Sequence, residues 1–196
     1  MSHTFARRFA IAALSLPLLL AGCADDEPVP KVQEPTAAPT PVASTSASPA
    51  APVEPTLPPE AEGKGIEAAE AFVRHYYAMV DHARRTGDTA ALREAALPTC
   101  ATCNEVVNII DRIRDREGSI EGGDQTVRRI ELGQLRGVPG AATFRGNATI
   151  TSTRQVITGY GDPLVDGTYP PGDIRVSVLV VKGKQGWRFA EWFVIS

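Results

Sequence analysis

The sequence predicts an α+β domain in which three N-terminal helices pack on a curved four-stranded antiparallel sheet. Apolar residues recur every three or four positions over residues 66–113, which is the spacing of one helix face. Beyond Gly122 and Gly123 they alternate with polar residues, which is the period of a half-buried strand. We therefore expect the helices to cover the apolar face of the sheet.

The first expected helix spans residues 66–85. Gly87 suits the left-handed position just after a helix end, and Asp88 is placed to cap the next helix. The apolar side chains of this helix that we expect to face inward are Ile66, Ala69, Phe72, Val73, Tyr76, Val80 and Ala83.

Two shorter helices are expected to follow. The second spans residues 89–97 and ends before Pro98. The third begins at Thr102 or Cys103, because Thr102 and Glu105 have the spacing of a capping box. Its expected inward residues are Val106, Val107, Ile109, Ile110 and Ile113.

Four strands are expected, over residues 127–135, 142–153, 174–180 and 187–195. The pair Arg128-Arg129 interrupts the alternation of the first strand and predicts a β-bulge there. The glycine-rich run 183–186 is typical of a turn between the last two strands.

The N-terminus has the parts of an export signal in the usual order. Arg7 and Arg8 precede an uncharged apolar run, residues 9–20, that is too short to span a bilayer. The Leu-Ala-Gly-Cys that ends at Cys23 resembles the lipobox of bacterial lipoproteins. That resemblance implies a signal peptide over residues 1–22 and a diacylglyceryl thioether on Cys23. The alternative is an ordinary secretory signal followed by a coincidental cysteine.

Residues 23–62 are expected to form a stalk. The segment holds 10 of the 16 prolines of the chain and lacks aromatic residues. It therefore has too little apolar area to offset the entropy of folding, and its prolines favour an extended polyproline II conformation. We expect a disordered, semi-rigid tether between the lipid and a folded domain over residues 63–196.

The charge of that domain argues against nucleic acid as a partner. Residues 63–196 carry 17 basic and 16 acidic side chains, without the basic stripe that nucleic-acid binding requires. A metal site would need more soft ligands than one cysteine pair, His75 and His82. We therefore expect neither a metal nor a cofactor.

Four segments carry a resemblance to a known family, namely residues 69–77, 86–88, 100–103 and 186–189. Together they resemble an actinobacterial family of lipoproteins of unknown function. The order of elements is also similar to the nuclear transport factor two-like, or cystatin-like, cone. That resemblance implies a fold shared by small-molecule isomerases, dehydratases and non-catalytic binding or dimerising domains, so it does not decide the function.

Cys100 and Cys103 form a Cys-x-x-Cys at the expected start of a helix. In an exported protein this favours a structural disulfide. The alternative is a thiol-disulfide oxidoreductase, since a helix N-terminus lowers the pKa of a thiol. The motif, however, does not follow a strand of a βαβ unit.

Four side chains are candidate ligand or partner contacts. Tyr76 lies within the apolar stripe of the first helix and Asp81 at its edge, where a tyrosine–carboxylate pair could exchange protons in a cavity. His75 and His82 lie far from the stripe and are expected to face solvent. Tyr160 and Tyr169 bracket a long Pro/Gly-rich connection that suits partner contact.

We expect a membrane-anchored protein on the outer face of the cell membrane, with a non-catalytic domain that binds an envelope protein or a small apolar ligand. The interior positions are mostly aliphatic or aromatic, so any cavity is expected to be small, apolar and without a carboxylate–histidine pair. The alternatives are an isomerase- or dehydratase-like enzyme in the cone cavity and the oxidoreductase. A second copy of the chain is a further candidate partner.

The Cys23→Ala variant should leave the membrane fraction or stay uncleaved, because it lacks the thiol that receives the lipid. Cell fractionation measures the first outcome, and mass spectrometry of the wild-type mature N-terminus measures the lipid directly. An unmodified Cys23, or cleavage at another residue, would contradict the anchor.

Overall fold

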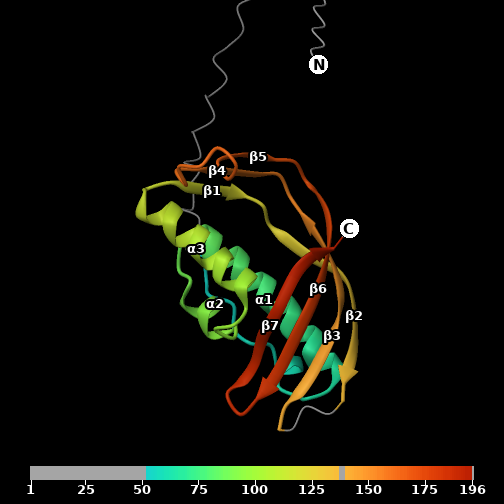
Figure 1. Ribbon diagram of the computed structural model, residues 1–196. Helices are drawn as coiled ribbons and strands as arrows, with labels where there is room; N and C mark the ends of the chain where they lie inside the picture. The colour runs from blue at the N-terminus through green and yellow to red at the C-terminus, as the bar shows by residue number, and fades with distance from the viewer. Residues whose placement is uncertain (1–51, 137–139, 196) are drawn as a thin grey trace, which may run out of the picture. The chain divides into compact units, whose positions relative to one another are not determined.

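The computed structural model describes residues 52–136 and 140–195. The expected signal peptide, Cys23 and the stalk up to residue 51 lie outside these residues. The described part is a mixed α+β fold in which α1 (Ile66–Thr86), α2 (Ala90–Glu94) and α3 (Ala101–Asp115) precede seven strands in the chain. The predicted α+β class is thus confirmed, and Figure 1 shows the helices on one face of a twisted sheet.

Helix α1 runs the length of the domain and ends as its sequence predicts. Gly87 has a φ of 75° and donates its N–H to the carbonyl of Ala83. Phe72, Val73 and Tyr76 are fully buried against the sheet. Within residues 52–136 and 140–195, no helix has both the length and the apolar character needed to cross a membrane.

Helices α2 and α3 differ in detail from the expectation. Helix α2 is shorter than residues 89–97 because the chain leaves it to pair with a strand. Asp88 still accepts a hydrogen bond from the N–H of Ala90 at 3.0 Å. The Thr102/Glu105 capping box was wrong: α3 begins at Ala101, and the Cys100 sulfur accepts from the N–H of Cys103 instead.

The main sheet has the strand order β2-β3-β6-β7 and is antiparallel throughout. Its strands are β2 (Gln125–Leu135), β3 (Ala142–Ser152), β6 (Gly172–Gly183) and β7 (Gly186–Ile195). The predicted bulge is confirmed, since the register between β2 and β3 shifts between Val127 and Arg129. Strands β2 and β7 are the two edges of this sheet.

A second, three-stranded sheet was not expected from the sequence. It has the order β1-β4-β5 and consists of β1 (Ser119–Gly122), β4 (Gln155–Thr158) and β5 (Gly167–Tyr169). The expected long connection therefore contains a strand, because the chain folds back on β4 after the turn near Asp162. Strands this short have too few residues to show a clear alternation.

An aromatic stack fills the space between α1 and the main sheet. The ring centroids of Tyr76 and Phe189 are 4.1 Å apart, and Phe72 lies 5.7 Å from Phe189 and 5.9 Å from Trp187. Such contacts combine large buried apolar area with favourable ring geometry. They fix α1 along the inner face of the sheet.

The packed part of the chain begins before residue 63. A 3-10 helix, Pro59–Ala61, buries Ala61 completely. The indole N–H of Trp187 donates to the Ala61 carbonyl at 2.8 Å, and Lys182 donates to the carbonyls of Ala61, Glu62 and Gly63. The proline-rich composition conceals this turn, because two distant side chains supply its hydrogen-bond partners.

The segment just after α2 covers one edge of the main sheet, strand β7. At β7, the N–H of Leu97 donates to the carbonyl of Phe189 at 2.7 Å, and the N–H of Phe189 donates to the carbonyl of Ala95 at 2.8 Å. This pairing ends α2 early. It also leaves less of the β7 backbone open to another chain.

Gly146 is expected to be the least replaceable glycine of the main sheet. A Cβ there would lie 1.9 Å from the backbone oxygen of Glu131. Gly146→Ala should therefore push β3 away from β2 and lower the free energy of unfolding by about 1–3 kcal/mol. Urea denaturation measures the loss. Gly133→Ala is the matched control, since its nearest atom is 3.9 Å away; equal losses in both variants would refute the steric explanation.

Candidate functional site

Polar side chains gather where the C-terminal half of α1 meets the main sheet. They are linked by contacts between aromatic rings, by interactions with the charge of Arg84, and by a hydrogen bond from Gln125 to Asp81. We call this group the inner polar cluster, and its members are Tyr76, Tyr77, Asp81, Arg84, Gln125 and Trp192. It combines residues spaced along one side of α1 with residues of β2 and β7.

Asp81 is the buried carboxylate of the cluster, with only 8% of its surface exposed. Its Oδ2 accepts the backbone N–H of Gln125 at 2.9 Å, and its Oδ1 lies 3.9 Å from Nη1 of Arg84. Burial raises the pKa of Asp81 from 3.8 to about 6, although the Gln125 hydrogen bond and Arg84 oppose the rise. Asp81 can therefore change its protonation state near neutral pH.

The aromatic members of the cluster contact one another and carry buried polar atoms. The Tyr76 and Tyr77 rings meet edge to face at 6.0 Å, and the Trp192 ring lies 6.5 Å from that of Tyr77. The Tyr77 phenol oxygen makes no hydrogen bond within the described residues. The Tyr76 phenol interacts with the Trp192 side chain, and this contact opposes the rise in the pKa of Tyr76. Burial raises the pKa of both tyrosines, so both remain neutral at physiological pH.

Helix α1 also closes the open edge of β2. Arg74 donates to the Val127 carbonyl at 2.6 Å, and Arg84 donates to the Gly123 carbonyl at 3.0 Å. Asp81 accepts the Gln125 N–H between these two contacts. Three side chains of one helix thus take the place of a neighbouring strand, which holds Asp81 and Arg84 in fixed positions.

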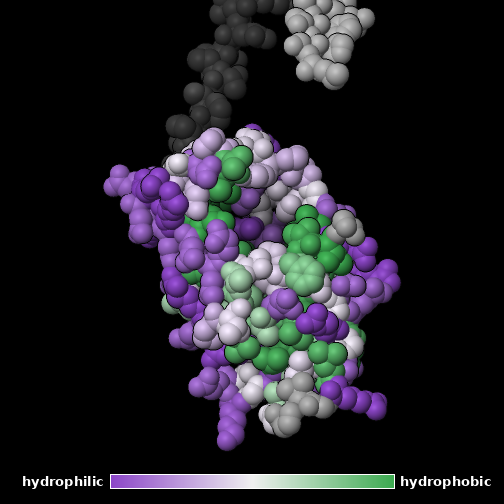
Figure 2. Space-filling view, in the orientation of Figure 1, coloured by the Kyte–Doolittle hydropathy of each residue, from purple (hydrophilic) through white to green (hydrophobic). Residues whose placement is uncertain are grey.

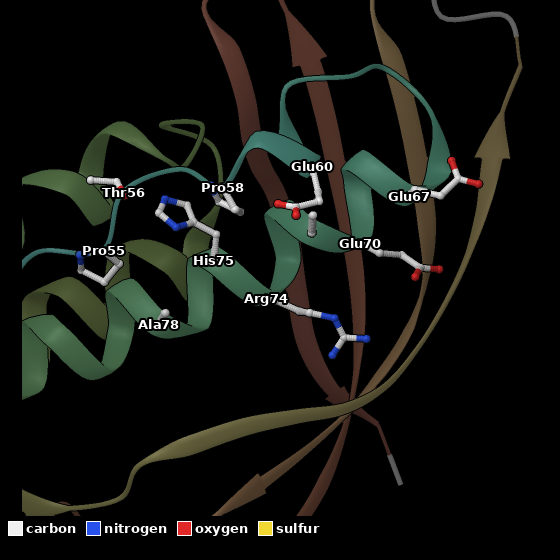
Figure 3. A pocket seen from close by; sticks show the side chains of 10 residues that line it. Pro55, Thr56, Pro58, Glu60, Glu67, Glu70, Arg74, His75 and Ala78 are labelled. Carbon is white, nitrogen blue, oxygen red and sulfur yellow. The ribbon is translucent and has the colours of Figure 1, made fainter.

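His75 lies apart from Asp81, in a groove on the outer side of α1. The groove has a volume of about 620 Å³ and is bordered by α1 and the segment around Pro55 and Pro58. Figure 3 shows His75 directed towards that segment and Arg74 directed away from it. Partial burial lowers the pKa of His75. Glu60, Glu67, Glu70 and Arg74 also border this groove, although most of its lining is apolar. The groove lies outside the space between α1 and the sheet, so the expectation of a small, apolar interior cavity stays a prediction.

The expectation that His82 faces solvent was wrong, because only 8% of its surface is exposed. It follows Met79 by three residues, on the side of α1 that borders α2. The tertiary packing covers more of α1 than its apolar stripe, since α2 and β1 contact the helix as well as β2. His82 and Asp81 therefore do not form a carboxylate–histidine pair.

Cys100 and Cys103 form a disulfide with an S–S distance of 2.03 Å, and each cysteine is 1% exposed. A thiol of another protein must reach a sulfur atom to exchange with it. The burial of both residues thus argues against catalytic exchange. Among the described residues, no group of three or more metal-ligating side chains gathers at one place.

Neither loop tyrosine belongs to the inner polar cluster, since Tyr160 lies in the connection between β4 and β5 and Tyr169 lies in β5. The guanidinium of Arg112 lies 4.4 Å from the centre of the Tyr160 ring, and Arg116 donates to the Tyr160 carbonyl at 2.8 Å. The Tyr169 hydroxyl donates to the Val165 carbonyl at 2.6 Å. Both residues help to hold the β4–β5 turn in place, and their contact with a partner stays a prediction.

The sequence singled out Tyr76 and Asp81 but missed Tyr77, Arg84, Gln125 and Trp192. Helix spacing could have identified Tyr77 and Arg84. Tyr77 lies four residues before Asp81 and Arg84 lies three residues after it, on the same side of a helix. No sequence pattern could have identified Gln125 and Trp192, since only the pairing of the strands brings these residues close to α1.

This architecture, with three helices and two antiparallel sheets, defines a class of small mixed α+β domains. The chain belongs to a family described as a family of unknown function, DUF6318, whose model matches residues 39–160. No curated protein matches the chain.

The chain is similar to solved structures at low sequence identity. The chain is similar to the intermembrane space region of the chloroplast protein ARC6, with 14% identity, a TM-score of 0.51, and coverage of 67% of this chain and 97% of that one. It is also similar to an uncharacterised protein with a cystatin-like fold from Caulobacter vibrioides, with 17% identity, a TM-score of 0.43, and coverage of 68% and 92%.

Replacing Asp81 with asparagine should change how stability depends on pH. The native pKa lies above the unfolded value, so the native state binds more protons between pH 4 and 6, and wild-type stability falls as the pH rises through that range. The contribution of Asp81 to this fall is about 3 kcal/mol at most. Asp81→Asn removes it, because the amide oxygen can still accept the Gln125 N–H without a charge.

Urea denaturation at several pH values from 4 to 7 measures the difference between the two proteins. The exposed carboxylate of Asp115 provides the control, and Asp115→Asn should follow the wild-type pH dependence. A parallel pH dependence in wild type and Asp81→Asn would contradict the assignment.

Proposed function

We propose that this protein is an exported, lipid-anchored envelope protein whose domain works by binding a ligand or partner, without catalysis. The observation that carries the binding proposal is the inner polar cluster, in which buried polar atoms lack protein partners beside a filled aromatic core. Support for the anchor comes from the sequence alone, through the apolar run and the Leu-Ala-Gly-Cys that ends at Cys23.

The arrangement of titratable groups supports a role without catalysis. General acid–base chemistry needs a proton donor and a proton acceptor in reach of one substrate. Asp81 is already held by Arg84 and the Gln125 N–H, and neither His75 nor His82 belongs to the cluster. The phenols of Tyr76 and Tyr77 have raised pKa values and hold their protons.

One observation favours the enzyme as the second candidate. A carboxyl whose pKa is near 6 is suited to accept and return a proton at neutral pH. With the phenols of Tyr76 and Tyr77 in the same cluster, Asp81 could act on a substrate that has an acidic C–H bond. We place this candidate second because Asp81 is engaged by Arg84 and a backbone N–H.

The nuclear transport factor two-like cone is our proposal for the fold. It is supported by a long helix laid along the inner face of a twisted four-stranded sheet, with a smaller sheet at one end (Figure 1). In such an arrangement the wide end of the cone is the natural place for a ligand. The inner polar cluster lies towards that end, where β2 begins and β7 ends.

The third candidate, a thiol-disulfide oxidoreductase, is tested by Cys100→Ser. Loss of the disulfide should lower the free energy of unfolding by about 2 kcal/mol, the chain-entropy value for so short a loop. Thermal denaturation measures this loss, and an insulin-reduction assay measures activity. We expect no reductase activity in wild type or variant; turnover by wild type that disappears in Cys100→Ser would overturn the proposal.

A further inference from the structure

We propose that the domain binds a phosphoryl group, as inorganic phosphate or as the phosphate of an ester, in a pocket bordered by Arg84, Arg85 and Arg114. We call this the arginine pocket. It is a second site that shares Arg84 with the inner polar cluster, and it does not depend on the binding proposed for that cluster.

The arginine pocket lies between the ends of α1 and α3 and the start of β1, and its volume is about 150 Å³. Arg84 and Arg85 come from α1, and Arg114 comes from α3. Among the described residues, no carboxylate borders the pocket. Its other lining residues are Gly87, Ile110, Ile113, Gly118, Ser119 and Ile120. At about 30 Å³ per water molecule, the space equals about five waters, one for each non-hydrogen atom of a phosphate.

Gly87 lets the Arg114 side chain lie against the end of α1. A Cβ at Gly87 would come within 2.6 Å of Nη1 and 2.9 Å of Cζ of Arg114. Arg114 also donates to the Thr86 carbonyl, which holds its guanidinium beside the last turn of α1. The glycine that ends α1 therefore leaves room for a cation of α3 next to Arg84 and Arg85.

The arginines at the end of α3 have two different roles. Figure 2 shows strongly hydrophilic residues over this end of the helix. Arg112 lies over the Tyr160 ring and Arg116 donates to the Tyr160 carbonyl, so both hold the connection between β4 and β5. Arg114 instead contacts the end of α1, and its charge borders the arginine pocket.

The three guanidinium groups of the pocket keep donors for a ligand. Each carries several N–H groups, and within the described residues each makes its hydrogen bonds through Nη1 alone. A phosphoryl group has oxygens in several directions, so it can accept from guanidinium groups that approach from two helices. A carboxylate has its oxygens in one plane and suits a single guanidinium.

The positive charge of the pocket is only partly neutralised. Asp124 pairs with Arg85 at 2.5 Å, and Oδ1 of Asp81 lies 3.9 Å from Nη1 of Arg84. Among the described residues, Arg114 has no carboxylate partner. Burial lowers the pKa of Arg84 although Asp81 opposes the fall, so the burial of this charge is not fully compensated. A bound anion would supply the missing compensation.

Isothermal titration calorimetry on the full-length protein, in a neutral detergent and at fixed ionic strength, tests the proposal. The probes are inorganic phosphate, glycerol 3-phosphate and acetate, and we expect both phosphates to bind more tightly than acetate. Dioctanoyl phosphatidic acid, added to the micelles, identifies the source of the phosphoryl group. Binding tighter than that of glycerol 3-phosphate indicates a lipid headgroup, and equal or weaker binding indicates a soluble phosphate.

Arg114→Gln removes a charged hydrogen-bond donor and should weaken phosphate binding about tenfold. Arg85→Gln should weaken it similarly. Arg112→Gln is the matched control, because it removes the same charge from α3 outside the pocket and should leave phosphate binding unchanged. Thermal denaturation verifies that each variant is folded.

The arginine pocket is refuted as a phosphate site if neither phosphate probe binds, if acetate binds as tightly, or if both pocket variants bind like wild type. Equal weakening by the control variant would also refute it, since the effect would then come from the overall charge. These variants leave every residue of the inner polar cluster in place, so such a failure does not affect the binding proposed for that cluster.

Discussion

The fold depends on α1, which makes two different kinds of contact with the main sheet. Towards the core, α1 buries Phe72 and Tyr76 against the apolar inner face of the sheet. Towards β2, it uses Arg74, Asp81 and Arg84 to pair backbone groups that a missing strand would otherwise leave open. The first contact supplies apolar burial, and the second fixes the position of the helix relative to the start of β2. Because Asp81 takes part in the second contact, the site and the fold share a residue.

The opposite edge of the sheet is closed by backbone and not by side chains. Ala95 and Leu97 pair with Phe189 of β7 just after α2. The Cys100–Cys103 disulfide follows within the same stretch and fixes the start of α3. This explains why two fully buried cysteines suit a structural role: they restrain the connection that protects β7. Covered edges also limit pairing with other chains.

Polar groups are distributed unevenly along the inside of the domain. The aromatic stack reaches the end where the β6–β7 turn and Ala61 meet, because Trp187 contacts Phe72 and donates to the Ala61 carbonyl. The inner polar cluster occupies the other end, where β2 begins and β7 ends. The same helix therefore passes from a filled core to a group of unpaired polar atoms, with Tyr76 and Tyr77 at the junction. Binding at the second end would leave the first intact, which suits a rigid module that works by contact.

The sequence by itself determined the features that depend on local pattern. The period of apolar residues placed α1 and the strands of the main sheet, Gly87 ended α1, and Arg128-Arg129 marked the bulge. These follow from the conformations that individual residues and their spacing allow.

Only the tertiary structure decided features that depend on residues far apart in the chain. The turn at Pro59–Ala61 exists because Lys182 and Trp187 supply its partners, and His82 is buried because several elements surround α1. The inner polar cluster forms because the register of the sheet brings Gln125 and Trp192 to α1. A local sequence pattern cannot show that these residues are close together, since their proximity results from tertiary packing.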